Sequence, residues 1–79
     1  MKVRIDVMLK EGVLDPQGKA IGHALKTLGF DNVEEVRAGK TFFLDVQESD
    51  VAKVMEMAEE MAHTILANLV IEDFKVTIL

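Results

Sequence analysis

Hydrophobic and polar residues alternate at the start of the chain. The hydrophobic members of this run share one side of an extended backbone: Val3, Ile5, Val7 and Leu9. A period of two predicts a half-buried strand over residues 2–10, of the kind found in antiparallel sheets. From Pro16 the hydrophobic residues recur at intervals of three and four, which predicts a helix from Pro16 to about Leu28. A glycine follows at position 29, where it favours the left-handed conformation that ends a helix.

Residues 33–46 predict two further strands. In the second of them Phe42, Leu44 and Val46 point to one side of the backbone. Between the two strands, Gly39 can supply the positive φ that a tight hairpin requires. This stretch therefore predicts a β-hairpin with its turn at Gly39.

The strongest periodic signal lies between residues 50 and 67. Its hydrophobic members recur at the spacing of one helix face: Val51, Val54, Met55, Ala58, Met61, Ala62, Ile65 and Leu66. This predicts a second amphipathic helix, with Ser49 as its N-cap and Asn68 in the left-handed conformation where it stops. Alternation resumes over residues 73–78 and predicts a last strand.

The predicted order is strand, helix, strand, strand, helix, strand. This order is typical of an α+β protein with a ferredoxin-like βαββαβ fold, a two-layer sandwich in which two helices cover one face of a four-stranded antiparallel sheet. No linker or repeat interrupts it, so residues 1–79 predict a single domain. The other face of the sheet would carry Met8 and Phe43, which indicates a surface for a partner.

The turn between the first strand and the first helix carries the clearest local signals. Pro16 fits the first helical position, and Asp15 before it is placed to cap the helix through backbone N–H groups of the first turn. Gly18 lies inside that turn, where a better helix former would add roughly 1 kcal/mol, so we expect another segment to approach its backbone closely. Because Gly18 and Gly22 share one face, close packing of this helix is the favoured explanation, and the approach of a partner protein is the alternative. Gln17 would point outward and is a second candidate for a partner contact.

The composition of the chain argues against several classes of function. The net charge of −5 and the pI of about 4.9 argue against nucleic-acid binding, and no hydrophobic run is long enough to span a membrane or act as a signal peptide. We therefore expect a cytoplasmic protein. The hydrophobic fraction of 49% is high for 79 residues, and a core of this size rarely supplies more than ~3–5 kcal/mol, so self-association or a stable partner is expected.

Residues with catalytic or metal-binding chemistry are sparse. The chain has no cysteine, and neither His23 nor His63 has neighbours at metal-ligand spacing, so we expect no catalytic residues, no metal site and no cofactor bound by this chain. Arg37 and Lys40 flank the predicted hairpin turn. They could bind a phosphate or an acidic surface, or they could serve solubility alone, and the sequence favours neither.

Three segments resemble a known family, and the resemblance runs through nearly the whole chain. They are Lys10-Glu11-Gly12-Val13-Leu14-Asp15-Pro16-Gln17-Gly18-Lys19-Ala20-Ile21, Val36-Arg37-Ala38-Gly39-Lys40, and Leu66-Ala67-Asn68-Leu69-Val70-Ile71-Glu72-Asp73-Phe74. Together they are similar to the PurS family, the small subunit of phosphoribosylformylglycinamidine synthase. The family pattern has Pro and Tyr where this chain has Leu69 and Phe74, so the loop loses rigidity and any hydrogen bond of the Tyr hydroxyl is lost.

The resemblance implies a non-catalytic subunit of an ATP- and glutamine-dependent ligase in purine biosynthesis. It implies a PurL-type synthetase subunit, which would carry ATP and Mg, and a PurQ-type glutaminase subunit, with the small subunit bridging the two, assisting ammonia transfer and forming a homodimer or a dimer of dimers. Residues for partner contacts are expected at the quoted motifs: Lys10, Asp15, Gln17, Gly18, Arg37, Lys40, Asn68 and Asp73.

Two alternatives belong to other functional classes. A regulatory domain of the same fold could bind an amino acid or nucleotide at residues 12–18, between the first strand and helix. Acylphosphatase-like hydrolysis needs an arginine in that same loop, and residues 12–18 contain none.

Overall fold

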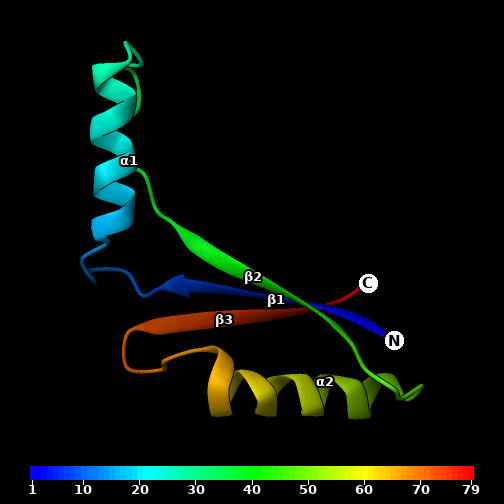
Figure 1. The fold of residues 1–79 in the computed structure, drawn as a ribbon. Helices are drawn as coiled ribbons and strands as arrows, with labels where there is room; N and C mark the ends of the chain where they lie inside the picture. Colours follow the sequence, from blue (N-terminus) through cyan, green and yellow to red (C-terminus); the bar gives the residue numbers. More distant parts are fainter.

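The computed structural model describes all 79 residues and contains three strands and two α-helices (Figure 1). In chain order the elements are β1 (Lys2–Leu9), α1 (Pro16–Thr27), β2 (Gly39–Asp45), α2 (Val51–Met61), the π-helical turn η1 (Ala62–Leu66) and β3 (Glu72–Ile78). The α+β class is therefore confirmed. No helix is long and hydrophobic enough to cross a membrane.

The sheet is antiparallel throughout, with β1 in the middle and the strand order β2-β1-β3. Val3 pairs with Leu44 on one side and with Ile78 on the other, which sets the register of both ladders. Val3, Ile5 and Val7 are at most 1% exposed, as the alternation predicts. On the opposite face Phe43 is 71% exposed, so this hydrophobic side chain does lie open to solvent.

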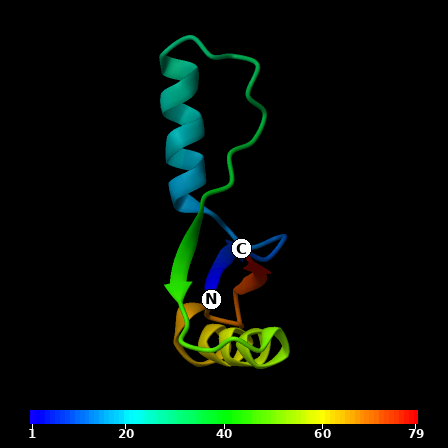
Figure 2. The same cartoon turned by 90° about the vertical axis from the view of Figure 1, so that its right-hand side faces the viewer.

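The predicted hairpin, and with it the fourth strand, is wrong. Residues 33–38 form no strand, and the chain runs from them into β2 without turning back (Figure 2). Gly39 begins β2 and does not have a positive φ. The physical reason is a pair of long-range contacts, because Asp15 binds the N–H of Ala38 and Arg37 binds carbonyls at the end of β1.

The expectation that both helices cover one face of the sheet is also wrong. Only α2 packs on the sheet, whereas α1 rises away from the far end of β1, with residues 28–38 returning along it (Figures 1 and 2). We call α1 and residues 28–35 the arm, and residues 36–38 connect it to β2. The radius of gyration is 15.9 Å, compared with about 12 Å for a compact domain of this length.

The core is small and lies between α2 and the sheet. It consists of eight buried residues: Val3, Ile5, Val7, Val46, Val54, Ala58, Ala62 and Ala67. At the end of α2 the N–H of Ala67 donates to the carbonyl of Ala62 at 2.9 Å, which closes a π turn. This wider turn keeps both alanines buried although they are five residues apart.

The helix ends follow the predictions in part. Gly29 has φ +96° and ends α1 as expected. The N-cap of α2 is Asp50, not Ser49, because the Asp50 carboxylate accepts from the N–H groups of Ala52 and Lys53. Asn68 does not adopt the left-handed conformation, since the π turn has already ended the helix.

Candidate functional site

The predicted partner-binding residues gather where the arm joins the sheet. Three ion pairs connect elements there: Arg37 to Asp15 at 3.9 Å, Lys40 to Glu72 at 3.7 Å, and Lys10 to Asp73 at 3.8 Å. Asn68 lies beside them, since its N–H donates to the carboxylate of Glu72 at 2.7 Å. We call this group the junction cluster: Lys10, Asp15, Gln17, Gly18, Arg37, Lys40, Asn68, Glu72 and Asp73.

Asp15 is the most buried charged member of the cluster, at 6% exposed. Its carboxylate accepts two backbone N–H groups, from Gly18 through Oδ1 and from Ala38 through Oδ2, both at 2.8 Å. These two hydrogen bonds, and then the charge of Arg37, hold the pKa of Asp15 below its usual value. The bond to Gly18 confirms the predicted N-cap. The bond to Ala38, twenty-three residues along the chain, has no counterpart in the sequence pattern.

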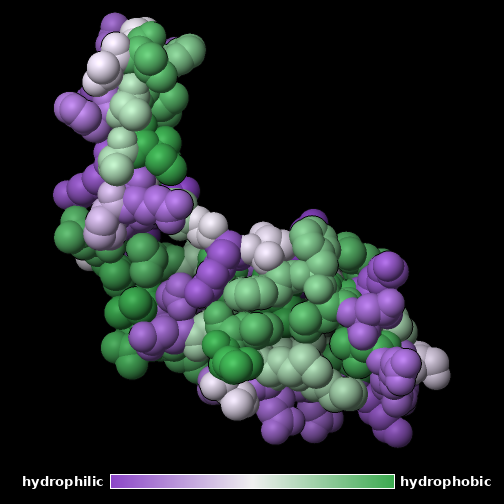
Figure 3. Space-filling model, in the orientation of Figure 1, coloured by the Kyte–Doolittle hydropathy of each residue, from purple (hydrophilic) through white to green (hydrophobic).

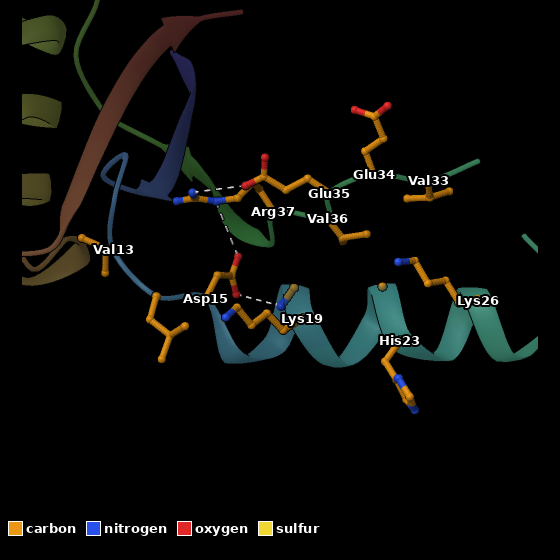
Figure 4. Close-up of a pocket in the computed structure, with 13 residues that line it drawn as sticks. Val13, Asp15, Lys19, His23, Lys26, Val33, Glu34, Glu35, Val36 and Arg37 are labelled. Carbon is orange, nitrogen blue, oxygen red and sulfur yellow. Dashed lines mark hydrogen bonds and ion pairs between the residues drawn. The ribbon is translucent and has the colours of Figure 1, made fainter. Parts of the chain in front are cut away.

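Arg37 does not lie at an exposed hairpin tip. Its guanidinium donates to the carbonyls of Leu9 and Lys10, both at 3.2 Å. Its Nε atom lies 3.9 Å from a carboxylate oxygen of Asp15 (Figure 4). The side chain is only 29% exposed. Arg37 therefore stabilises the chain's own junction, and its charge is already matched.

Gly18 is approached closely, as expected, but by the chain itself. A Cβ added at Gly18 would lie 2.2 Å from the carbonyl oxygen of Val36 and 2.8 Å from a carboxylate oxygen of Asp15. The same test at Gly22, one turn further on, meets only the Val36 side chain, at 3.6 Å. The missing side chain of Gly18 thus admits residues 36–38 and not a partner.

The other half of the cluster joins β2 and β3 across β1. Lys40 and Glu72 form an ion pair although β1 lies between their strands. Glu72 was not among the predicted partner-binding residues, although it belongs to the junction cluster. Its side chain is only 15% exposed. The available signal was its position beside Asp73 in the third family-like segment. Gln17 lies exposed at the start of α1, near this pair, in a hollow of about 300 Å³.

The two departures from the family pattern have structural consequences. Leu69 is half-buried and packs against the core, so the loop after η1 is held by hydrophobic contact where the pattern has a proline. Phe74 is half-buried, with its ring centroid 6.2 Å from that of His63 in an edge-to-face arrangement. Both side chains therefore pack against the core.

A groove of about 390 Å³ runs between α1 and residues 33–37 (Figure 4). Its lining carries both signs of charge, with Lys19 and Lys26 on the helix and Glu34 and Glu35 on the other side. His23 points away from residues 33–37 (Figure 4). No group of three or more His, Cys, Asp or Glu residues is placed to hold a metal ion. The charged side chains of the groove can form hydrogen bonds with backbone groups and ion pairs with side chains of opposite charge.

The fold and the junction cluster define a small α+β protein in which a projecting helical arm is joined to a three-stranded sheet by polar contacts. Residues 2–79 match the family model described as PurS: phosphoribosylformylglycinamidine (FGAM) synthase. The chain belongs to the PurS family. The prediction made from the three motif segments is confirmed.

Individual relatives support the same assignment. The phosphoribosylformylglycinamidine synthase subunit PurS of Bacillus subtilis is 45% identical over 74 residues, which cover 94% of this chain and 87% of that protein. The crystal structure of Methanocaldococcus jannaschii PurS, described as a subunit of formylglycinamide ribonucleotide amidotransferase in the purine biosynthetic pathway, matches with a TM-score of 0.86. It is 42% identical, and the match covers 96% of this chain and 92% of that one. A chain in the structure of PurLQS from Thermotoga maritima matches with a TM-score of 0.89 and 31% identity, covering 99% and 95%.

Proposed function

We propose that this chain is the small, non-catalytic subunit of an FGAM synthase and that it bridges a PurL-type synthetase subunit and a PurQ-type glutaminase subunit. The observation that carries the proposal is the match over nearly the whole chain to a subunit of the Thermotoga maritima PurLQS structure. In this proposal the synthetase subunit binds ATP and Mg. The small subunit works in the cytoplasm, holds the two partners together and assists the transfer of ammonia between them.

Reconstitution tests the bridging role. The synthetase and glutaminase subunits from the same organism are purified and combined with and without this chain, and FGAM formation is measured with glutamine or with ammonium chloride as the nitrogen source. A bridging subunit is required for the glutamine reaction and dispensable for the ammonia reaction. Equal glutamine-dependent rates without the chain would refute the proposal.

The exposed members of the junction cluster are the proposed contact with these partners. Gln17 is the sharpest probe, because it is exposed and its side chain makes no hydrogen bond within the chain. We expect Gln17→Ala to weaken assembly, measured by sedimentation with the synthetase subunit, and to leave the chain's own unfolding midpoint unchanged. Lys53→Ala, on the exposed side of α2 and far from the junction, is the control and should not weaken assembly.

The chain is also proposed to form a homodimer, or a dimer of dimers, through the arm. Its accessible surface is 5842 Å², about 1,000 Å² more than the roughly 4,800 Å² expected for a compact protein of 8.8 kDa. That excess is close to the ~800 Å² that each partner buries in a standard interface. Hydrophobic residues follow the inner side of the arm, facing the angle that it makes with the sheet (Figure 3).

A pair of variants at neighbouring positions tests the role of the arm. Ile21 in α1 and Leu28 at its C-cap lie on one side of the helix and are 40% and 72% exposed, while Thr27 lies about 100° around the helix from Leu28. We expect Leu28→Glu to yield a smaller particle in light scattering coupled to size exclusion, and Thr27→Glu to keep the size of the wild-type protein. An unchanged mass for Leu28→Glu would exclude this face of the arm from the interface.

A further inference from the structure

The direction of the arm is not set by hydrophobic packing on the sheet. The buried core contains no residue of α1, and the helix makes no extensive contact with any strand or with α2 (Figure 1). The connections between the arm and the sheet are residues 10–15 at the end of β1 and residues 36–38 before β2. A helix joined to a domain only by two such segments would be free to swing unless specific contacts restrain it.

Asp15 and Arg37 supply contacts of this kind. The carboxylate of Asp15 accepts from Gly18 in α1 and from Ala38 before β2, so one side chain fixes the start of the helix to the start of a strand. Arg37 donates to the carbonyls of Leu9 and Lys10 where β1 ends. Three backbone segments are therefore tied together by two side chains that also face each other at 3.9 Å.

We propose that Asp15 is a positioning residue: by bridging Gly18 and Ala38 it holds the arm at one fixed angle to the sheet, ready to dock. Its role thus exceeds that of a helix cap. The close passage of the Val36 carbonyl over Gly18 belongs to the same device, because only a bare position lets residues 36–38 reach the Asp15 carboxylate.

A comparison of the two capping aspartates, Asp15 and Asp50, can distinguish the capping role from the bridging role. Asp50 caps α2 by accepting from Ala52 and Lys53 of its own helix, and it bridges to nothing else. Asparagine caps helices about as well as aspartate. Its side chain, however, has one acceptor oxygen, and its amide nitrogen is a donor that would face a second N–H. Asp15→Asn should therefore keep the cap and lose the bridge, whereas Asp50→Asn should lose nothing.

The test measures the angle of the arm directly. Because the chain has no cysteine, Lys26→Cys on α1 and Lys75→Cys on β3 introduce two unique attachment points for spin labels, both at exposed positions. Distances between the labels are measured by pulsed electron paramagnetic resonance. The doubly labelled chain is diluted with unlabelled chain, so that each assembly carries one labelled copy.

We expect one narrow distance peak for the labelled parent and for Asp50→Asn, and loss of that peak, with a broad distribution, for Asp15→Asn. Circular dichroism should show the helix content retained in both variants. A narrow, unshifted peak for Asp15→Asn would overturn the proposal. If Asp15→Asn does not fold, Arg37→Met is measured in its place, because it removes the hydrogen bonds to Leu9 and Lys10. A broad distance distribution for Arg37→Met would support the proposal, and a narrow, unshifted peak would overturn it.

The distance measurement needs no partner subunit, so it stands apart from the proposed function. Binding to the synthetase subunit is measured in parallel by titration calorimetry. Weaker binding of Asp15→Asn together with a broad distribution supports a pre-set arm. Binding at wild-type strength together with a broad distribution would refute the claim that the fixed angle serves docking.

Discussion

Gly18 and Gly22 lie on the same side of α1, one turn apart, and offer a matched pair of substitutions with opposite expected signs. Alanine is favoured over glycine in a helix by about 1 kcal/mol, so both changes gain a similar amount from helix propensity. At Gly22 the new methyl group would meet Val36 at 3.6 Å, an ordinary contact. We therefore expect Gly22→Ala to stabilise the protein by about 0.5–1 kcal/mol.

At Gly18 the same methyl group has no room. The carbonyl oxygen of Val36 would be 2.2 Å away and must retreat by roughly 1 Å to restore a normal contact. The oxygen belongs to the backbone, so the movement displaces residues 36–38 and the hydrogen bond between Ala38 and Asp15. Overpacking of this kind costs about 1–3 kcal/mol, which exceeds the gain in propensity.

The measurement is urea unfolding of both variants by circular dichroism, at one protein concentration because association would shift the midpoint. Since the propensity gain is shared, the difference between the two variants isolates the clash, and we expect Gly18→Ala to be the less stable by about 1–3 kcal/mol. Equal stabilisation by both substitutions would show that residues 36–38 do not pass over Gly18 as described.

Three further predictions concern the core, a cap and pH. Ile5→Val removes one methylene group from the fully buried centre of β1 and should cost about 0.5–1.5 kcal/mol in urea unfolding. Asp50→Ala should lower the free energy of unfolding by about 1 kcal/mol, whereas Ser49→Ala should change it little, as measured by the same urea unfolding. The opposite order of the two variants would show that Ser49 is the cap. Asp15 has a lowered pKa when folded, so its contribution is fully present above the ordinary value of 3.8 and is lost as pH falls through the folded pKa. Acid unfolding should therefore be less steep in Asp15→Asn than in wild type, and identical slopes would refute this assignment.

Local sequence patterns correctly predicted much of this structure. The alternation of Val3, Ile5 and Val7 correctly predicted a half-buried strand, and Pro16 and Gly29 correctly marked the two ends of α1. Each of these signals is decided by neighbours a few residues away. Such features can be predicted because backbone sterics and the sides of strands and helices depend little on the rest of the fold.

The errors arose where distant residues decide the conformation. Gly39 permits a hairpin, but the contacts of Asp15 with Ala38 and of Arg37 with Leu9 hold the chain straight there. No pattern of periodicity reveals a hydrogen bond between residues 15 and 38. These contacts hold residues 36–38 where a fourth strand was expected, and α1 leaves the sheet at the same junction, so both errors in the fold lie at one place that the sequence pattern does not reveal.

The candidate site was predicted as a list of residues and not as an arrangement. The motif segments placed Asp15, Arg37 and Lys40 on it, and the structure brings them to one end of the sheet. Glu72 was omitted because its ion pair with Lys40 crosses an intervening strand, which only the strand order β2-β1-β3 makes visible. Whether the exposed members bind a partner stays a prediction.

The small core has a consequence for the life of the protein in the cell. Eight buried residues give the isolated chain little reserve against unfolding, whereas every molecule bound to its folded form adds to that reserve by mass action. Copies made in excess of their companions would therefore open more often and be degraded first. If the chain assembles as proposed, its abundance would therefore follow that of the subunits that bind it.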